Sequence, residues 1–353
     1  MQRGRIDRQD AEFKRAFQSW NTLEKAEENQ YLSQSVISNR VESLLRSYSP
    51  ASASTNFNSA VSIATAAGVS TIFSEWGTNI DVPDTYTGPH VKWPATTENV
   101  QAVIHHIRTK PDTPLHEKYV CEILGRACQH FSTKLKDSVH DMQVPADVGS
   151  KLVICGDTHG QLADFLWVLK KNGEPGPKIA YLMNGDIADR GDYACEIFVI
   201  VLLFMLLYPD RVSINRGNHE NLEMNRRPAE VGGGFFEEVT RKYDAAVFMM
   251  FQQLFELLPL ATVISRRVLV VHGGLPRRDG ALVAHMRNVN RRRQCPTSAD
   301  SLEDALIFDL LWADPQVPPS RRKPRPGRAL HTVAETVRVV TRRLGAVTPR
   351  RTG

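Results

Sequence analysis

Acidic, amide and imidazole side chains follow four short apolar runs of this sequence, close behind the point where each run ends. These residues are Asp157, His159, Asp186, Asn218, His219 and His272. Asp157 and His159 are two residues apart, so an extended backbone would direct both side chains to the same side. One such pair is more often a surface hydrogen bond than a metal site. Side chains of the same ligand types also follow the three further runs, and this repetition favours a metal-binding centre.

The apolar runs that precede these residues are strand-like in length and composition. They are Lys151–Cys155, Ile179–Met183, Val212–Ile214 and Val268–Val271. Open sheets with helical connections gather ligands and catalytic groups at the carboxyl ends of their strands. Helices predicted at Gln161–Asn172 and Ala194–Tyr208 would supply such connections, which indicates α/β layering.

Two more helices are predicted ahead of the first run, at Thr96–Arg108 and His116–Leu135, and should flank the sheet. The first opens on a Thr-Thr-Glu-Asn stretch that can cap a helix. Residues 5–48 have apolar side chains at three- and four-residue steps, which predicts an amphipathic helix. That helix could hold a regulatory protein, although such a stripe more often packs on its own protein. Residues 49–70 have the composition of a linker.

Composition excludes several classes of protein. The 353 residues are 42% apolar, enough for one sizeable core. The formal charge is +5, but residues 317–353 carry +9 and the rest −4, so we expect no specific nucleic-acid surface. The longest apolar run, Ile197–Tyr208, has twelve residues, too few for a membrane span. Five cysteines without a Cys-x-x-Cys pair or a secretory leader predict reduced thiols and an intracellular protein, cytoplasmic and/or nuclear.

Four segments of the chain resemble the signatures of the phosphoprotein phosphatase family of serine/threonine protein phosphatases, in order and approximate spacing. They are Gly156–Gly160, Gly185–Gly191, Gly217–Glu220 and His272–Gly274, with Leu310–Pro315 as a further landmark. The resemblance spans roughly Thr96 to Gln316. Around the motifs it is closest to the branch of protein phosphatase 5 and the EF-hand phosphatases.

The resemblance implies two divalent metal ions and assigns their ligands. Asp157, His159 and Asp186 would hold one ion, and Asp186, Asn218 and His272 the second, with the Asp186 carboxylate bridging. Two cations about 3.5–4 Å apart can activate a water and polarise a phosphoryl oxygen for attack. Mixed imidazole and oxygen ligands suit manganese, the ion expected in vitro, or iron or zinc, better than calcium.

The same resemblance gives roles to three neighbouring residues. His219 would be the general acid that protonates the departing serine or threonine oxygen. Asp189 would orient that imidazole, or alternatively only cap the following helix. Arg190 would offer a bidentate fork to the phosphate oxygens. Arg216, beside a glycine turn, is interpreted as structural, in an ion pair inside the fold.

The resemblance stops after Gln316, where the chain becomes rich in Pro and Arg. The family's later elements, including an Arg-x-His whose histidine would complete the second metal site, are not recognisable, so the domain is interpreted as truncated or divergent at its C-terminus. Missing strands would leave apolar surface and sheet edges uncovered. Residues 225–236 also lack the family's Tyr-Gly-Phe element, which predicts a reshaped loop.

We therefore expect an α/β (α+β layered) fold, a calcineurin-like metallophosphoesterase β-sandwich with flanking helices, incomplete at the C-terminus. Residues 1–95 would form a helical and linker region, 96–316 the catalytic domain, and 317–353 a basic tail. The expected activity is hydrolysis of phosphoserine and phosphothreonine on proteins by a two-metal-activated water. The alternatives are a catalytically impaired binding protein that lacks the last metal ligand, and a metallophosphoesterase of small molecules such as dinucleoside polyphosphates.

Overall fold

The computed structural model describes residues 76–296 and 301–313. The predicted amphipathic helix within residues 5–48, the linker at 49–70 and the basic tail at 317–353 lie outside these ranges. The boundaries of the three expected regions stay predictions. The first helix of the described part begins at Thr97, close to the expected start of the catalytic domain.

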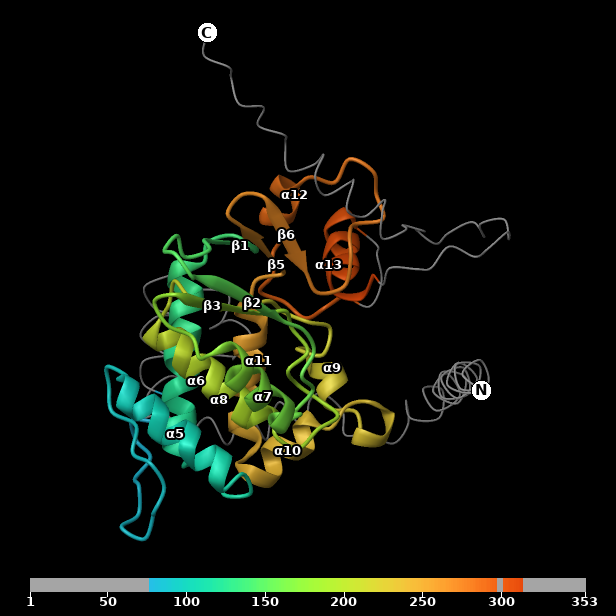
Figure 1. Cartoon of the computed structure of the whole chain (residues 1–353). Helices are drawn as coiled ribbons and strands as arrows, with labels where there is room; N and C mark the ends of the chain where they lie inside the picture. Colours follow the sequence, from blue (N-terminus) through green and yellow to red (C-terminus); the bar gives the residue numbers. More distant parts are fainter. Residues whose placement is uncertain (1–75, 297–300, 314–353) are drawn as a thin grey trace, which may run out of the picture. The chain divides into compact units, whose positions relative to one another are not determined.

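A parallel sheet stands at the centre of the described chain (Figure 1). Its strands are β2 (Lys151–Cys155), β3 (Ile179–Met183) and β4 (Val212–Ile214), in the spatial order β2-β3-β4. Helix α7 (Leu162–Asn172) connects the first two strands, and α8 (Ala194–Leu207) connects the second pair. All three strands and both helices were predicted from the sequence, to within one residue at each end.

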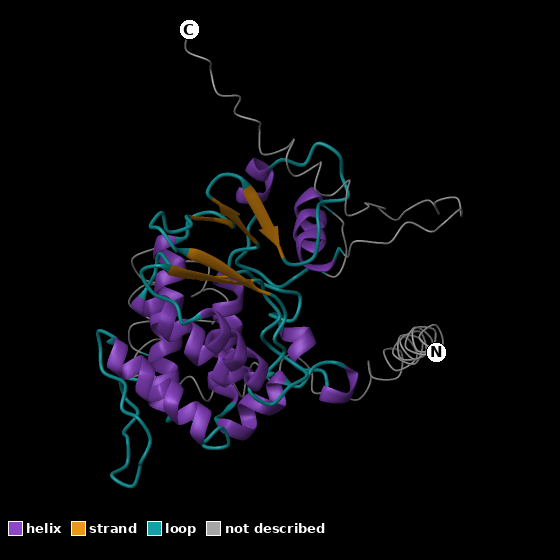
Figure 2. Ribbon diagram, viewed as in Figure 1, coloured by secondary structure: helices purple, strands orange, loops and turns teal. Residues whose placement is uncertain are grey.

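A second sheet faces the first. It contains β1 (Val139–Met142), β5 (Ala261–Ile264) and β6 (Val268–Val271), with β1 parallel and β6 antiparallel to β5. The two sheets meet through a small apolar cluster that includes Met142 and Leu182. The predicted calcineurin-like sandwich with flanking helices is thus confirmed, and Figure 2 shows its strands and helices.

Strands β1 and β5 were not predicted, for two different physical reasons. His140 and Asp141 interrupt the apolar character of β1. Strand β5 follows the apolar helix α11 (Ala245–Leu257) after only a short connection, so no polar boundary separates helix from strand in the sequence. The sequence could therefore predict the parallel sheet but only one strand of its partner.

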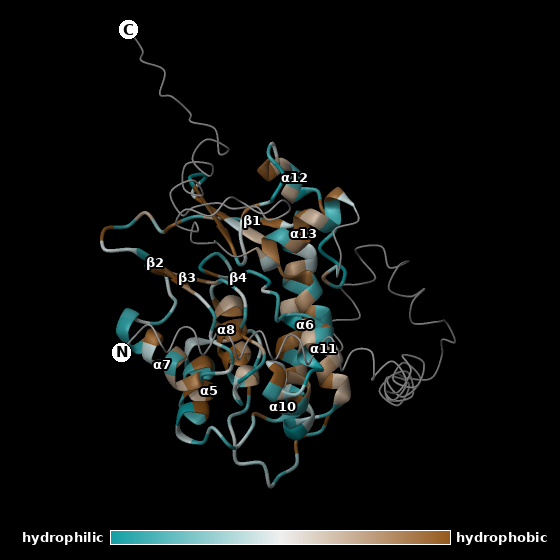
Figure 3. Cartoon of the chain, turned by 90° about the vertical axis from the view of Figure 1, so that its right-hand side faces the viewer, coloured by the Kyte–Doolittle hydropathy of each residue, from teal (hydrophilic) through white to brown (hydrophobic). Residues whose placement is uncertain are grey.

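Helices cover the outer face of the parallel sheet. They are α5 (Thr97–Thr109), α6 (Glu117–Lys134) and α10 (Phe235–Lys242), together with α8 and α11. Helix α8 packs against α5, α6 and α10, and every residue from Ala194 to Met205 is buried. Figure 3 shows the resulting concentration of hydrophobic residues along α8. Thr96 caps α5 as expected, since its hydroxyl accepts the Asn99 N–H.

The remaining helical segments are short and lie near the site or beside the second sheet. They are α9 (Leu222–Asn225), the 3-10 turn η1 (Ala229–Val231), α12 (Val283–Arg287) and α13 (Leu302–Trp312). Among all the described helices, none combines the length and the apolar character that crossing a bilayer requires.

The edges formed by β2 and β6 leave apolar side chains in contact with solvent. Leu152 on β2 and Val270 on β6 pack partly against the cluster between the sheets. Ile154 lies two residues after Leu152, and Val268 lies two residues before Val270. Because side chains alternate along a strand, each shares a face with that neighbour. Ile154 and Val268 are nevertheless 49% and 48% exposed. Apolar side chains are therefore exposed at these two edges of the described sheets. The interpretation that missing strands cause such exposure stays a prediction.

Candidate active site

The loops that follow β2, β3 and β4 converge because the three strands are parallel and in register. Cys155 lies opposite Met183, and Met183 lies opposite Ile214. Hydrogen bonds continue one residue past the strands, from the Asn184 N–H to the Cys155 carbonyl and from the Asn215 N–H to the Met183 carbonyl. The predicted ligands Asp157, His159, Asp186 and Asn218 all lie in the three loops that begin there.

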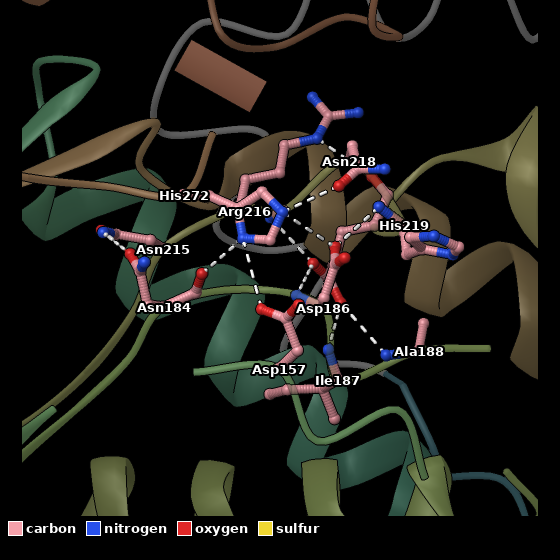
Figure 4. Close-up of polar contacts among 12 residues, drawn as sticks. Asp157, Asn184, Asp186, Ile187, Ala188, Asn215, Arg216, Asn218, His219 and His272 are labelled. Atoms are coloured by element: carbon pink, nitrogen blue, oxygen red, sulfur yellow. Dashed lines mark hydrogen bonds and ion pairs between the residues drawn. The ribbon is translucent and has the colours of Figure 1, made fainter. Parts of the chain in front are cut away.

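His272 reaches the same place from the other sheet, at the end of β6 (Figure 4). The Asn184 side chain donates to the Val271 carbonyl at 3.0 Å, and the His272 Nδ1 lies 2.7 Å from the Asn184 carbonyl. Asn184 therefore ties the two sheets together beside the site. The sequence predicted the presence of His272 here but not its delivery by the second sheet.

Asp186 stands at the centre of the cluster. Two groups of side chains have ligand atoms close enough to share a cation, His159 with Asp186 and His219, and Asp157 with Asp186 and His272. The Asp186 carboxylate is common to both, with Oδ2 3.6 Å from His159 Nε2 and Oδ1 3.4 Å from His272 Nε2. This geometry fits the expected bridging role. It groups Asp157 with His272 rather than with His159, so the assignment of ligands to individual ions stays a prediction.

The two imidazoles are oriented as metal-ligating histidines usually are. His159 Nδ1 lies 2.8 Å from the Ala188 carbonyl, and His272 Nδ1 is held by the Asn184 carbonyl. A carbonyl only accepts, so each Nδ1 carries a proton and each Nε2 faces oxygen atoms, those of Asp186 in both cases and Asn218 Oδ1 at 2.8 Å as well for His272. Acceptors that face one another in this way require a shared proton or a cation between them. The donor set therefore fits a metal centre.

Burial and charge shift the pKa values of these groups. Burial lowers the pKa of His272, but its contact with Asp186 outweighs burial and raises the pKa to about 9. Burial raises the pKa of Asp186, but the contacts with His272 and His219 outweigh it and lower the pKa. For His159 burial dominates, and its pKa is lowered. Asp186 is thus held as a carboxylate that attracts positive charge.

The loop that carries Asp186 is held in strained backbone conformations by Glu220. Asp186, Asp189 and Arg190 have positive φ angles of 52°, 71° and 67°, each of which costs on the order of 1–3 kcal/mol outside glycine. The buried Glu220 carboxylate accepts the N–H groups of Asp186, Ile187 and Ala188 at 2.8–3.2 Å. Glu220 was not among the predicted site residues, although an acid directly after the Asn218 and His219 pair was a visible signal.

The His272 loop is supported by the end of α13. The N–H groups of Gly273 and Gly274 donate to the carbonyls of Leu310 and Asp309, at 2.8 and 3.2 Å. A Cβ on Gly274 would lie 2.2 Å from the Ala313 carbonyl oxygen, so no larger residue fits there. The described part of the Leu310–Pro315 landmark, which ends at Ala313, therefore contributes to the site by packing against the loop that presents a predicted ligand.

His219 and Asp189 form a buried pair beside the predicted metal ligands. His219 Nδ1 lies 2.8 Å from Asp189 Oδ2, and its backbone N–H donates to Asp186. The other Asp189 oxygen accepts the Phe235 N–H at 3.0 Å. The carboxylate contacts the imidazole, as the orienting role requires, and also accepts the first N–H of a helix. That helix is α10 rather than α8, the helix that follows Asp189 in the sequence. The alternative, that Asp189 only caps the helix that follows it, is wrong.

The two arginines of the motifs have opposite environments. Arg190 is exposed, and within the described ranges no hydrogen bond or ion pair engages its guanidinium. It lies near enough to His159 to lower that residue's pKa. Arg216 is buried and donates to the carbonyls of Glu220 and Arg293. It is structural, as predicted, but main-chain oxygens replace the expected ion pair.

The loop after the pair is the one that lacks the family's Tyr-Gly-Phe element, and its reshaping relative to the family stays a prediction. It contains η1, and Gly233 accepts the Arg190 N–H at 2.8 Å, so the loop closes over the segment that carries Asp189. At its start, the Asn225 side chain donates to Asp189 Oδ2 and to the His219 carbonyl. Asn225 was not predicted as a site residue, because nothing in its sequence neighbourhood distinguishes it from a loop asparagine.

Comparisons with known proteins agree with this geometry. The sequence profile described as calcineurin-like phosphoesterase matches residues 150–344. Serine/threonine-protein phosphatase T of Aspergillus oryzae is 35% identical over 255 residues, 71% of this chain and 49% of that protein. Human serine/threonine-protein phosphatase 5 is 36% identical over 238 residues, 67% of this chain and 44% of that protein. The chain spans about half the length of these curated relatives.

A solved structure is also similar. It is a protein serine/threonine phosphatase from Saccharomyces cerevisiae, described as having similarity to human phosphatase PP5. The match has a TM-score of 0.55 and 37% sequence identity, and covers 61% of this chain and 65% of that one. The similarity therefore includes both the sequence and the fold.

Proposed function

This chain belongs to the calcineurin-like phosphoesterase family, and we propose that it hydrolyses phosphoserine and phosphothreonine esters of proteins. One observation carries the proposal. The Asp186 carboxylate lies between the Nε2 atoms of His159 and His272, and the His219 and Asp189 pair lies directly beside it. The phosphatases named among the similar proteins support a phosphoprotein as the substrate.

Members of this family use divalent metal ions, and the donor set of this chain fits them. Asp157, His159, Asp186, Asn218 and His272 would hold two such ions. When bound, the ions would lower the pKa of a water and polarise the phosphoryl oxygen. We propose manganese as the ion that supports activity in vitro, with iron or zinc as alternatives, because imidazole and oxygen ligands suit all three.

The protein's own residues bind the phosphoryl group and donate the proton. Asp189 occupies His219 Nδ1, which leaves Nε2 to donate to the departing serine or threonine oxygen. The exposed Arg190 guanidinium can take two phosphoryl oxygens in its planar fork. Because water is the attacking group, no phosphorylated side chain is formed.

Release of inorganic phosphate from a phosphothreonine peptide with added manganese tests the proposal. The full chain should release phosphate, and Asp157→Asn and His219→Asn should abolish it. Asp164→Asn and His105→Asn are matched controls, since both residues are exposed and lie on helices, outside the loops that carry the predicted ligands. The proposal would be wrong if the folded chain binds manganese but releases no phosphate, or if the two site variants keep full activity.

Two other functions make different predictions in the same assay. An impaired binding protein would bind a phosphopeptide without turnover. It is favoured because the second ion would have only Asp186, Asn218 and His272 as its predicted ligands among the described residues. A small-molecule phosphoesterase would turn over a dinucleoside tetraphosphate faster than the phosphopeptide. Comparing binding and turnover of both compounds separates the three functions.

We further propose that the protein acts inside the cell, in the cytoplasm or nucleus, and that the helix predicted within residues 5–48 holds a regulatory protein. The five free cysteines, four of them buried, support a reducing compartment. Fractionation of cells that express the tagged chain tests its location. Pull-down with and without residues 1–75 tests the regulatory partner, which should be lost with the segment.

A further inference from the structure

The Asn225 side chain makes a closed set of hydrogen bonds around the His219 and Asp189 pair. It is completely buried. Its Nδ2 donates to Asp189 Oδ2 at 2.9 Å and to the His219 carbonyl at 2.7 Å. Its Oδ1 accepts from Gln252 Nε2 on α11 at 2.9 Å. Both N–H bonds of the amide are therefore used, and both end on the two residues of the pair.

This arrangement fixes the two residues relative to one another. Asp189 Oδ2 accepts from His219 Nδ1 and from Asn225, while Oδ1 accepts the Phe235 N–H. Asn225 is the donor that joins the carboxylate to the main chain of the histidine itself. Without it, the carboxylate could rotate about its bond to Cβ, and the imidazole would lose its fixed tilt. The position of His219 Nε2 depends on that tilt.

An amide is the side chain that this position requires. An aliphatic residue would remove one of the two donors to Asp189 Oδ2 and leave the His219 carbonyl without its side-chain donor; a buried polar group without a partner costs about 1–3 kcal/mol. An aspartate would place a second carboxylate against Asp189. Gln252 is buried as well, and its Oε1 has no hydrogen-bond partner among the described residues. The one hydrogen bond of its side chain there is the one that its Nε2 donates to Asn225. Its buried amide serves Asn225 alone.

We propose that Asn225, held by Gln252, is a positioning residue that aims His219 Nε2 at the departing oxygen. The inference rests on the proposed function. In that reaction a water gives up a proton and its oxygen forms a bond to phosphorus, the ester P–O bond breaks, and the Nε2 proton moves to the serine or threonine oxygen. The proton released by the water balances the one that His219 gives up. Among the described residues, the Asn225 side chain hydrogen-bonds only to Asp189, His219 and Gln252, none of them a predicted metal ligand, so its effect should be limited to proton donation.

The dependence of the rate on the leaving group tests this role. A serine or threonine alkoxide needs a proton to depart, whereas p-nitrophenolate is a weak base that departs without one. Asn225→Leu should lower kcat on a phosphothreonine peptide by roughly 10–100-fold, the range for residues that orient an active-site group, with little change in KM. Its kcat on p-nitrophenyl phosphate should fall less than three-fold. His219→Asn should give the same pattern with a larger loss.

Two further variants keep the test decisive. Asn172→Leu makes the same substitution in a half-buried asparagine on α7, and both rates should stay unchanged. Gln252→Leu removes only the donor to Asn225, so it tests the same role if Asn225→Leu does not fold. Its decrease in kcat should be smaller than that of Asn225→Leu, but again confined to the phosphothreonine peptide. Equal losses on both substrates, or a change in KM alone, would overturn the proposal.

Proton NMR of the chain with ¹⁵N-labelled histidine gives a readout that does not depend on activity. The Nδ1–H of His219, bonded to Asp189, should give a slowly exchanging signal that disappears in His219→Asn. It should be broadened or lost in Asn225→Leu and kept in Asn172→Leu. An unchanged signal in Asn225→Leu would overturn the positioning role. A wild-type chain that shows this signal but hydrolyses neither substrate would instead contradict the proposed function.

Discussion

The two halves of the candidate active site are supported by different parts of the fold. The predicted metal ligands lie in loops that begin at strand ends, and Glu220, from one of those loops, braces the segment that carries Asp186. The proton-donating half, His219 with Asp189, is held from the helical layer, through Asn225, Gln252 and the first residue of α10. Local sequence therefore defines the first half, whereas tertiary packing defines the second.

Substitution of Asp186 should have the largest effect, because this carboxylate belongs to both ligand groups. Asp186→Asn removes the negative charge that two cations would share. Loss of an orienting residue alone costs roughly 10–100-fold, so we expect phosphate release to fall by more than that. The assay is phosphate release at saturating manganese, with Asp164→Asn as the control. Activity within ten-fold of the wild type would contradict the shared role.

Substitution of His219 should separate the two halves. His219→Asn should lower phosphate release from the phosphothreonine peptide by about 10²–10⁴-fold, the usual contribution of a general acid. Bound manganese should stay as in the wild type, since the Asp186 ligands are intact. Metal content measured beside the rate decides this. If the variant loses its metal, His219 is itself a metal ligand, and the division into a metal-binding half and a proton-donating half is wrong.

Substitution of Glu220 should weaken the metal half while leaving proton donation intact. Each Glu220 oxygen accepts two backbone N–H groups, Oε1 those of Ile187 and Ala188 and Oε2 those of Asp186 and Gly217. Glu220→Gln replaces one of these oxygens by an N–H₂ that repels them. We expect manganese affinity to fall by roughly 10–100-fold, without a change in the ratio of rates on the two phosphate esters. Titration calorimetry measures the affinity, with the exposed neighbour Glu223→Gln as the control. An altered rate ratio would show that Glu220 supports both halves.

The pH dependence of stability tests the helical layer that supports the proton-donating half. Burial, opposed by Lys242 and reinforced by Glu238, raises the pKa of Glu196 to about 7. An unfolded glutamic acid titrates near pH 4.3, so between these values the folded chain holds a proton that the unfolded chain has released. The stability contributed by this group is therefore present below about pH 4 and lost as the pH rises through 7.

Glu196→Gln removes this titration. The decrease in the free energy of unfolding between about pH 5 and 8 should become smaller, by up to roughly 3 kcal/mol. Urea unfolding across this range measures it, with exposed Glu237→Gln as the control. A decrease equal to that of the wild type would show that Glu196 is ionised throughout and firmly paired with Lys242.

Substitution of Val268, on the exposed edge of β6, should have the smallest effect on the activity of the site. Val268→Lys should change the free energy of unfolding by no more than about 0.5 kcal/mol, as at other surface positions, and leave phosphate release unchanged. Self-association should decrease, since a charge blocks edge pairing. Sedimentation velocity at matched concentrations measures this, with exposed Trp167→Lys on α7 as the control. A large loss of activity would mean that the edge supports the metal half.

The sequence predicted the elements that are marked by a repeated pattern, a short apolar run followed by polar residues. Apolar runs ending in polar clusters located β2, β3, β4 and β6, and the motifs located every metal-ligand candidate that the structure brings together. The sequence did not predict β1, whose His140 and Asp141 break the apolar pattern, or β5, which follows the apolar helix α11 almost directly. Nor did it predict Asn225, because its role arises only when residues far apart in the chain, Asp189 and Gln252, fold against it.

The metal content of the full chain after dialysis against manganese tests the central claim most directly. The account predicts two bound ions per chain in the wild type and in His219→Asn, and fewer than two in Asp186→Asn, because one carboxylate serves both ligand groups. A wild-type chain that binds no manganese, or an Asp186→Asn chain that keeps two ions, would contradict a centre built around Asp186.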